Sequence, residues 1–266
     1  MGAEIRLGTM GWSYPDWRGP FYDADVPATR YLDQYARVFS TIEIDSTFYG
    51  TPRPSTVVGW AAQVSPGFRF SAKLPRDITH GRRLVGGAEA AVEFASVLSA
   101  GMGAKLGAIL VQLPPDFGPG EYGVFRKFIE AITGRGNSGR FPWVVEFRNI
   151  GFRDTDALTF LVEHGVACAT SERLDMGGPL RYVRLLGTEN AFSRFDERQI
   201  ERTEELAAWA ERLKMARDEA DSSTTISVHA RNFYEGHAPA TLRDLGERLG
   251  IAVPEPPGRQ QMSLFL

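Results

Sequence analysis

The chain has 266 residues, of which 43% are hydrophobic, and its formal net charge is −3 at pH 7. This composition can build one large domain or two small ones, and it excludes disordered, collagen-like and coiled-coil proteins. The acidic balance also excludes a globally basic nucleic-acid-binding protein, so an anionic partner has to be bound by a local patch.

The single cysteine and the apolar segments bear on the cellular compartment. Cys168 lies in the apolar run VACAT and cannot form an internal disulfide, so we expect a buried structural thiol in a reducing compartment. The N-terminus lacks a basic stretch followed by an apolar one, and no segment is long enough to span a bilayer. These features predict a cytoplasmic protein.

The first half of the chain alternates short strands with helical segments. A strand at residues 5–8 leads into the aromatic loop GTMGWSYPDWRGPFY, which either plugs one end of the fold or walls a ligand site. Ile42 and Ile44 alternate with Glu43 and Asp45, which predicts a strand with both acids on one face. The other predicted elements are helices at 29–39, 54–64, 88–100 and 122–132, and strands at 68–73, 105–113 and 143–149.

The second half continues the alternation with one interruption. A helix at 154–164, with Asp154 as its cap, precedes a strand at 166–171. A short loop then leads directly to another strand at 180–186. The remaining predicted elements are a helix at 197–219, a strand at 225–232, a helix at 238–249 and a Pro-rich linker with an apolar end at 252–266.

Strands alternating with helices at these intervals predict a parallel sheet. Eight strands and seven helices fit a single (β/α)8 TIM-type barrel over residues 1–251 that lacks the helix after strand six. The alternative is an open doubly wound sheet, which is weakened because no strand leads into a GxGxxG turn.

A closed barrel would turn one face of each strand toward the lumen. The faces opposite the apolar ones carry Glu43, Asp45, Ser71, Lys73, Gln112, Glu146, Arg148, Tyr182, Arg184, His229 and Arg231. Barrel interiors are ordinarily layered with Val, Ile and Leu, and barrel active sites lie at the C-terminal strand ends. We therefore expect a polar site at that end, with a salt-bridge network that only fills the lumen as the alternative.

The cations among these residues outnumber the acids, and Arg76 and His80 follow just beyond one strand. Arginine suits bidentate binding of phosphate, so we expect a phosphate-bearing ligand such as a nucleotide, a nucleic-acid end or a sugar phosphate. The candidate catalytic residues are Glu43, Glu146 and Lys73. The candidate ligand-binding residues are Trp12, Tyr14, Asp45, Tyr49, Arg76, His80, Gln112, Arg148, Arg184, His229, Arg231 and Asn232.

The four histidines bear on whether a metal is used. His80, His164, His229 and His237 show neither an HExxH motif nor paired spacing. The spacing therefore does not support a divalent metal, and we expect no cofactor. His164 ends a helix, where it would interact with the helix dipole, and His237 would cap the last helix at the surface.

Seven motifs in chain order carry a family resemblance: GTMGWSYPDWRGPFY, IEIDSTFY, FRFSAKLPRDITH, LVQLPPDF, VEFR, YVRLLG and NFYEGHAP. Together they resemble the YecE-like family, a domain-of-unknown-function family of bacteria and archaea. The resemblance implies a TIM barrel related in shape to the xylose-isomerase and endonuclease-IV-like barrels, and it supplies no reaction. Residues on matching positions are Glu43, Lys73, Glu146, Arg148, Arg184 and Asn232. The chain departs from the family pattern at Asp45, Leu186 and Arg231, where Asn, His and Asn are usual.

The end of the chain reads QMSLF, and it resembles the motif with which bacterial proteins bind the sliding clamp. Gln261, Leu264 and Phe265 would contact the clamp, with Pro254, Pro256 and Pro257 holding the peptide off the barrel. Alternatively, Met262, Leu264 and Phe265 fold back over an apolar patch of the protein itself.

Three functions follow from these features. A clamp-bound barrel would be a DNA-repair-associated phosphoester hydrolase. The alternatives are a metabolic sugar-phosphate isomerase or hydrolase, and a non-catalytic anion-binding module. We expect an enzyme of hydrolase or isomerase type.

Overall fold

The computed structural model describes residues 2–134, 141–179 and 181–258. Eight parallel strands follow one another in chain order around a closed barrel, as the strand alternation predicts. Their bounds are β1 Glu4–Met10, β2 Thr41–Ile44, β3 Arg69–Lys73, β4 Leu106–Gln112, β5 Trp143–Glu146, β6 Ala167–Ser171, β7 Tyr182–Leu185 and β8 Thr225–Ala230. The chain divides into two compact units, residues 1–43, 63–68 and 183–266 in the first and 44–62 and 69–182 in the second.

The α-helices also follow the predicted order. They are α1 Tyr31–Tyr35, α2 Pro54–Ala62, α3 Ala88–Met102, α4 Tyr122–Thr133, α5 Ala157–Glu163, α6 Thr203–Glu219 and α7 Ala238–Leu249. Within the described residues between β6 and β7 no helix forms, which confirms the predicted interruption.

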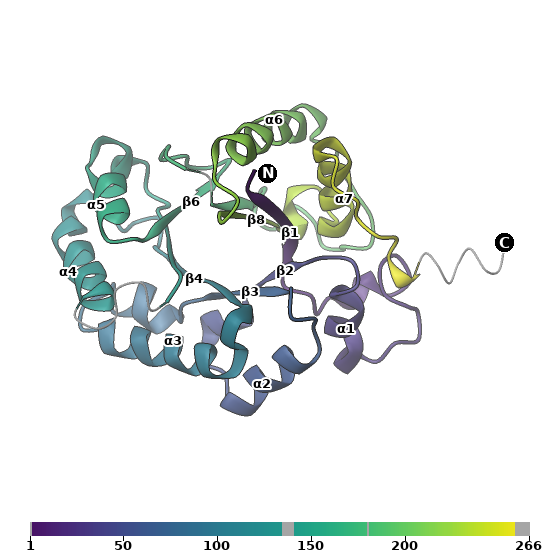
Figure 1. Ribbon diagram of the computed structural model, residues 1–266, viewed down its shortest axis with the longest axis horizontal. Coiled ribbons are helices and arrows are strands. Elements are labelled where there is room, and N and C mark those ends of the chain that lie inside the picture. The colour runs from purple at the N-terminus through teal and green to yellow at the C-terminus, as the bar shows by residue number, and fades with distance from the viewer. Residues whose placement is uncertain (1, 135–140, 180, 259–266) are drawn as a thin grey trace. The chain divides into compact units, whose positions relative to one another are not determined.

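In the first unit, β1 pairs with β2 on one side and with β8 on the other. The strands approach closely at Gly8, where an added Cβ would lie 2.1 Å from the carbonyl oxygen of Thr41. Helices α6 and α7 pack against each other and against β1 (Figure 1). The two helices therefore cover β1 in this unit.

The aromatic loop after β1 is part of the core of the first unit. Trp17, Phe21 and Tyr22 are all buried. Phe21 stacks on Phe39 with ring centroids 5.8 Å apart, and Tyr22 stacks on Tyr31 at 4.3 Å. Aromatic side chains bury a large apolar area. Of the two predicted roles of the loop, a hydrophobic plug or a wall of a ligand site, this part of the loop has the first.

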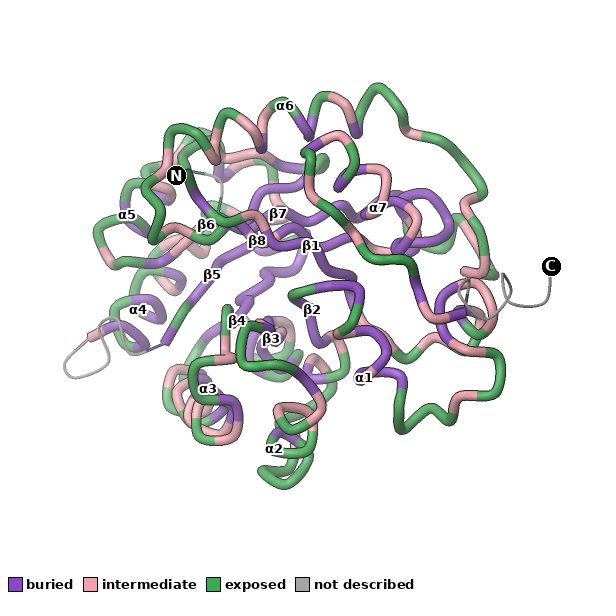
Figure 2. Tube along the Cα trace, turned by 45° about the vertical axis from the view of Figure 1, so that its right-hand side comes forward, coloured by how far each residue is buried: buried purple, intermediate pink, exposed green. Residues whose placement is uncertain are grey.

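In the second unit, β3, β4, β5 and β6 pair in sequence, with Gln112 in register with Glu146. Below this polar pair, the same strand face forms an apolar cluster of Ala108, Leu110, Val144, Ala169 and Tyr182. The strands are mostly buried, with exposed or half-buried residues at some strand ends, whereas the helices expose one side (Figure 2). The alternation of strand faces therefore holds, with an apolar layer deep in the unit and a polar layer at the C-terminal strand ends.

Several predicted boundaries are wrong by a few residues. Most strands are shorter than predicted, so Asp45 and Arg148 follow β2 and β5 instead of lying within them. The segment after β5 forms a 3-10 helix at Ile150–Asp154, and α5 begins only at Ala157. Asp154 is therefore not the cap, and the hydroxyl of Thr155 instead accepts a hydrogen bond from the Ala157 amide at 3.2 Å.

The Pro-rich segment after α7 is bound to the first unit. Arg243 donates hydrogen bonds to the carbonyls of Val253 and Pro254, at 3.3 and 2.8 Å. The amide of Gly258 donates to the carbonyl of Phe21 at 3.1 Å. The predicted extended tether is thus wrong for residues 252–258, and Gln261, Leu264 and Phe265 lie outside the described residues.

Among the helices of the described residues, none combines the length and the apolar character that crossing a membrane requires.

Candidate functional site

The first unit buries an ion pair between β2 and β7. Arg184 donates two hydrogen bonds to the carboxylate of Glu43, Nε to Oε2 at 2.9 Å and Nη2 to Oε1 at 2.7 Å. Both side chains are almost fully buried. The strand alternation places each on the polar face, and the bidentate geometry holds Glu43 as an ionised acceptor. This pair is a fixed structural and electrostatic unit, so Glu43 is a poor candidate for a general base.

His229 on β8 lies beside this pair. Its Nε2 is 3.3 Å from the hydroxyl of Thr41, and the residue is fully buried. The pKa of His229 is lowered to about 4, mainly by burial, with Glu43 raising it and Arg184 lowering it. The imidazole is therefore neutral at pH 7 and can accept or donate one proton in a hydrogen bond.

The second unit gathers its cations around Phe48, in the 3-10 helix after β2. The Nζ atom of Lys73 lies 3.9 Å from the centroid of the Phe48 ring, a cation–π contact. The ring of His80 packs edge-on against the same ring, with centroids 5.1 Å apart. Lys73 ends β3 and His80 lies in a π-helical turn at Asp77–Gly81, so both reach the C-terminal side of this strand.

His80 lies among the cations of this cluster. Its pKa is lowered to about 4, first by burial and then by Lys73, Arg148 and Arg76, against a rise from Asp116. The Nδ1 atom lies 2.8 Å from the hydroxyl of Thr79, which orients the ring. His80 is thus a neutral hydrogen-bonding group in cationic surroundings. The structure brings Lys73, Arg76 and Arg148 close enough to act on the pKa of His80, and their role in ligand binding stays a prediction.

Glu146, on β5, is paired with Gln112, on β4 of the same unit. It is buried at the end of β5, and its Oε2 accepts a hydrogen bond from the Nε2 of Gln112. The amide donor lowers the cost of burying the carboxylate. The role of Glu146 in general acid or base chemistry stays a prediction.

The three aromatic residues predicted to bind ligand have different environments. Tyr14 and Trp12 are half-buried: the Tyr14 hydroxyl donates to the Met10 carbonyl at 2.7 Å, and the Trp12 carbonyl accepts from Tyr22. Tyr49 is 87% exposed and its ring centroid lies 5.7 Å from that of Phe48. Tyr49 therefore offers an open aromatic surface next to the Lys73 and His80 cluster.

Asn232 and Arg231, both predicted to bind ligand, contact other parts of the protein, and so does His237. The Oδ1 atom of Asn232 accepts a hydrogen bond from the Ala238 amide at 2.9 Å, so Asn232 caps the start of α7. His237, predicted as the surface cap, is instead buried against Trp17. Arg231 lies over the Phe233 ring and forms a 3.6 Å ion pair with Glu189.

His164 and Cys168 behave as their sequence contexts predict. His164 follows α5, and its Nδ1 lies 2.8 Å from the Phe160 carbonyl at the helix end. Cys168 is buried on β6, and burial raises the pKa of its thiol to about 12. Neither is a candidate for catalysis.

Sequence reasoning missed Phe48 and Thr79. Both contact His80, yet Phe48 reads as one aromatic residue among many, and Thr79 as an ordinary loop residue. The sequence feature that could have indicated Phe48 is its position just after β2, the strand that carries Glu43. In the part of the chain that the structure describes, no three His, Cys, Asp or Glu side chains group as metal ligands.

A family model for a protein of unknown function, DUF72, matches residues 6–262. The chain belongs to the DUF72 family. YecE of Escherichia coli K12, described as a UPF0759 protein, is 32% identical over 135 residues, which are 51% of this chain and 47% of YecE. The match thus spans about half the length of this relative. The YecE-like resemblance is confirmed.

Solved structures agree on the fold. A DUF72 family protein of Thermotoga maritima MSB8 has 21% identity and a TM-score of 0.74, with 93% of this chain and 99% of that chain covered. A xylose isomerase domain protein of Alicyclobacillus acidocaldarius has 13% identity and a TM-score of 0.50, with 93% and 96% covered. The likeness to both supports the TIM barrel of this DUF72 protein.

Proposed function

We propose that this DUF72 protein binds a phosphate-bearing ligand through Lys73, Arg76, His80 and Arg148. The observation that carries the proposal is the convergence of Lys73 and His80 on the Phe48 ring, with Arg76 and Arg148 near enough to act on the pKa of His80. Three cations around one neutral hydrogen-bonding side chain favour an anion with several acceptor oxygens.

Two of the other predicted cations belong to the first unit: Arg184 is held by Glu43, and Arg231 lies against Glu189. The proposed binding group is therefore limited to the second-unit cations that act on the pKa of His80, namely Lys73, Arg76 and Arg148.

Tyr49 favours a ligand that also carries a base. An aromatic ring that is 87% exposed next to bound phosphate offers a face on which a nucleobase can stack. A nucleotide or a nucleic-acid end fits this arrangement better than a sugar phosphate does. Glu146 would act as general base in a phosphoester hydrolase, and the alternative is a module that binds without turnover.

The binding experiment uses the full chain and isothermal titration with inorganic phosphate, nucleoside monophosphates and sugar phosphates. Removing one charged hydrogen-bonding partner costs about 1.5–3 kcal/mol, so Lys73→Met and Arg148→Met should each weaken binding about 10- to 100-fold. Arg82→Met is the matched control, because Arg82 is exposed and paired with Asp77. Absence of phosphate binding by the wild type, or equal binding by Lys73→Met, would refute the proposal.

Catalysis is tested on ligands that bind. Glu146→Gln keeps the size of the side chain and removes its basicity, so binding should stay within about threefold while turnover is lost. Binding without turnover by the wild type would select the non-catalytic module.

A further inference from the structure

The turn that carries His80 continues into a backbone conformation that residues with a side chain rarely adopt. After the π-helical turn at Asp77–Gly81, Arg83 and Leu84 have φ angles of +47° and +69°. The left-handed region is costly for both residues, because the Cβ atom comes too close to the following carbonyl oxygen. A conformation of this kind persists only where the surrounding contacts hold it.

Leu84 closes the turn from within. Its side chain is buried, and its amide donates a hydrogen bond to the carbonyl of Ile78 at 2.9 Å. Ile78 lies in the π-helical turn and is buried too. This hydrogen bond fixes the shape of the turn, so the exchange rate of the Leu84 amide reports on that shape.

Arg83 reaches from this turn to the segment between β4 and α4. Its Nε and Nη2 atoms donate to the two carboxylate oxygens of Glu121, at 2.7 and 2.5 Å. Its Nη1 donates to Oδ2 of Asp116 at 3.0 Å, and Nη2 also donates to the Asp116 carbonyl at 3.1 Å. The guanidinium lies over the Phe117 ring, 5.5 Å from its centroid. The planar fork of arginine suits this bidentate arrangement, which lysine does not reproduce.

Asp116 is also an acidic neighbour of His80. Burial comes first among the causes that lower the pKa of His80, followed by Lys73, Arg148 and Arg76, whereas Asp116 raises it. Asp116 has a side chain that is 77% exposed, and a carboxylate beside these cations would repel an anionic ligand. The ion pair with Arg83 reduces that repulsion.

We propose that Arg83 is a positioning residue of this site, which ties the turn carrying His80 to the segment before α4 and screens the carboxylate of Asp116. Without the guanidinium, the costly backbone at Arg83 and Leu84 relaxes, and His80 shifts from the Phe48 ring that it packs against. The consequence for phosphate rests on the proposed function of the site, whereas the consequence for His80 does not.

The first measurement follows His80 in the full chain without ligand, by NMR titration of the histidine rings, with His80 assigned from His80→Gln. In Arg83→Met the proton affinity of His80 should rise about two- to fivefold, the effect of one exposed charge. Arg82→Met is the matched control, because Arg82 pairs with Asp77 of its own turn at 2.8 Å, and it should change the titration less. No rise in Arg83→Met, or an equal rise in Arg82→Met, would overturn the proposal.

Two further variants separate the charge of Arg83 from its geometry. Arg83→Met/Asp116→Asn removes the unscreened carboxylate as well, so the proton affinity of His80 should return toward the wild-type value. Arg83→Lys keeps the charge but loses the fork, so the Leu84 amide should exchange several-fold faster in Arg83→Lys as well as in Arg83→Met. Wild-type exchange of Leu84 in both variants would overturn the positioning role.

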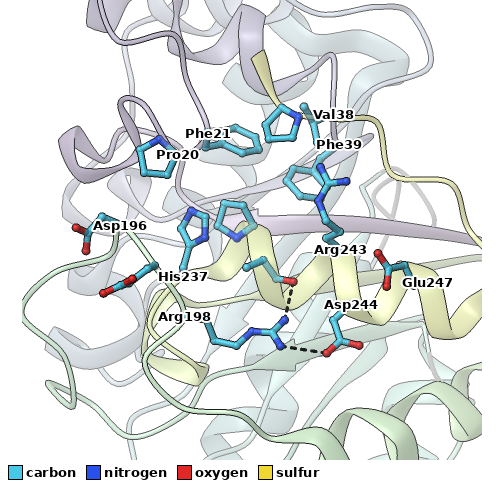
Figure 3. A pocket seen from close by; sticks show the side chains of 14 residues that line it. Pro20, Phe21, Val38, Phe39, Asp196, Arg198, His237, Arg243, Asp244 and Glu247 are labelled. Atoms are coloured by element: carbon cyan, nitrogen blue, oxygen red, sulfur yellow. Dashed lines mark hydrogen bonds and ion pairs between the residues drawn. The ribbon is translucent and has the colours of Figure 1, made fainter. Parts of the chain in front are cut away.

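A control in the first unit separates local positioning from a general loss of stability. Arg198 joins the loop before α6 to α7, with hydrogen bonds to Asp244 at 3.2 Å and to the Ala240 carbonyl at 2.9 Å (Figure 3). Arg198→Met removes these bonds and should leave both the His80 titration and the Leu84 exchange unchanged. The same changes in Arg198→Met as in Arg83→Met would contradict a local role.

The last measurement is isothermal titration with inorganic phosphate. Arg83→Met should weaken binding at least about threefold, with part of the loss recovered in Arg83→Met/Asp116→Asn. If the wild type binds no phosphate, the proposed function fails, and the His80 titration and Leu84 exchange still decide the role of Arg83. Equal binding by the wild type and Arg83→Met would refute that role and leave the proposed function standing.

Discussion

The buried pair of Glu43 and Arg184 allows a stability prediction with a defined magnitude. Arg184→Met keeps an apolar stem and removes both hydrogen bonds to Glu43, at 2.9 and 2.7 Å. Removing one partner of a buried pair costs about 3–5 kcal/mol, because a desolvated charge loses its compensation. For a chain of this size, about 2–4 °C per kcal/mol gives a fall in the melting temperature of roughly 6–20 °C.

The assay is urea unfolding, with calorimetry for the melting temperature. Arg37→Met is the matched control, since Arg37 pairs with Asp33 at 2.8 Å but has a side chain that is 59% exposed. An exposed pair contributes about 0–1 kcal/mol. In Glu43→Gln/Arg184→Met no charge remains at the pair, so we expect the double variant to recover part of the loss. A loss below about 1 kcal/mol in Arg184→Met, or no recovery in the double variant, would refute the reasoning.

Three further predictions concern His229, Gly187 and the C-terminal peptide. His229 has a folded-state pKa of about 4 against 6.5 for the unfolded chain, so the unfolded state binds the extra proton and stability falls as the pH drops below 6.5. The loss should reach about 2 kcal/mol at pH 5 in urea unfolding and shrink in His229→Gln; a pH-independent wild type would contradict it. Gly187→Ala should destabilise the protein by more than about 2 kcal/mol in the same assay, because its φ is +66° and an added Cβ would lie 2.0 Å from the Phe233 carbonyl oxygen. Gly165→Ala, also at φ +66° but with nothing within 4 Å, is the control and should cost about 1–2 kcal/mol, so equal losses would count against the steric explanation. Finally, a peptide ending in QQMSLFL should bind the bacterial sliding clamp at least tenfold more tightly than its Leu264→Ala/Phe265→Ala counterpart in fluorescence anisotropy, and equal affinities would remove the DNA link.

The sequence alone determined the barrel and the side of each strand that is polar. The alternation of Ile42 and Ile44 with Glu43 decides which side chains share a face, because a strand has a period of two residues. The same alternation predicted that Glu43 requires a cation, since a buried carboxylate is costly without one. The order of helices and strands predicted the missing helix before β7, because element type depends mainly on local pattern.

Only the tertiary structure decided which groups meet. Glu43 could have paired with any of several cations, and the choice of Arg184 depends on the positions of β2 and β7, 141 residues apart in sequence. Phe48, in the 3-10 helix after β2, contacts Lys73 at the end of β3 and His80 in the turn that follows it. No spacing in the sequence reveals these contacts. The Pro-rich segment reads as an extended tether, but Arg243 on α7 binds its carbonyls. Local composition sets the stiffness of a segment, whereas contacts with distant residues decide where it lies.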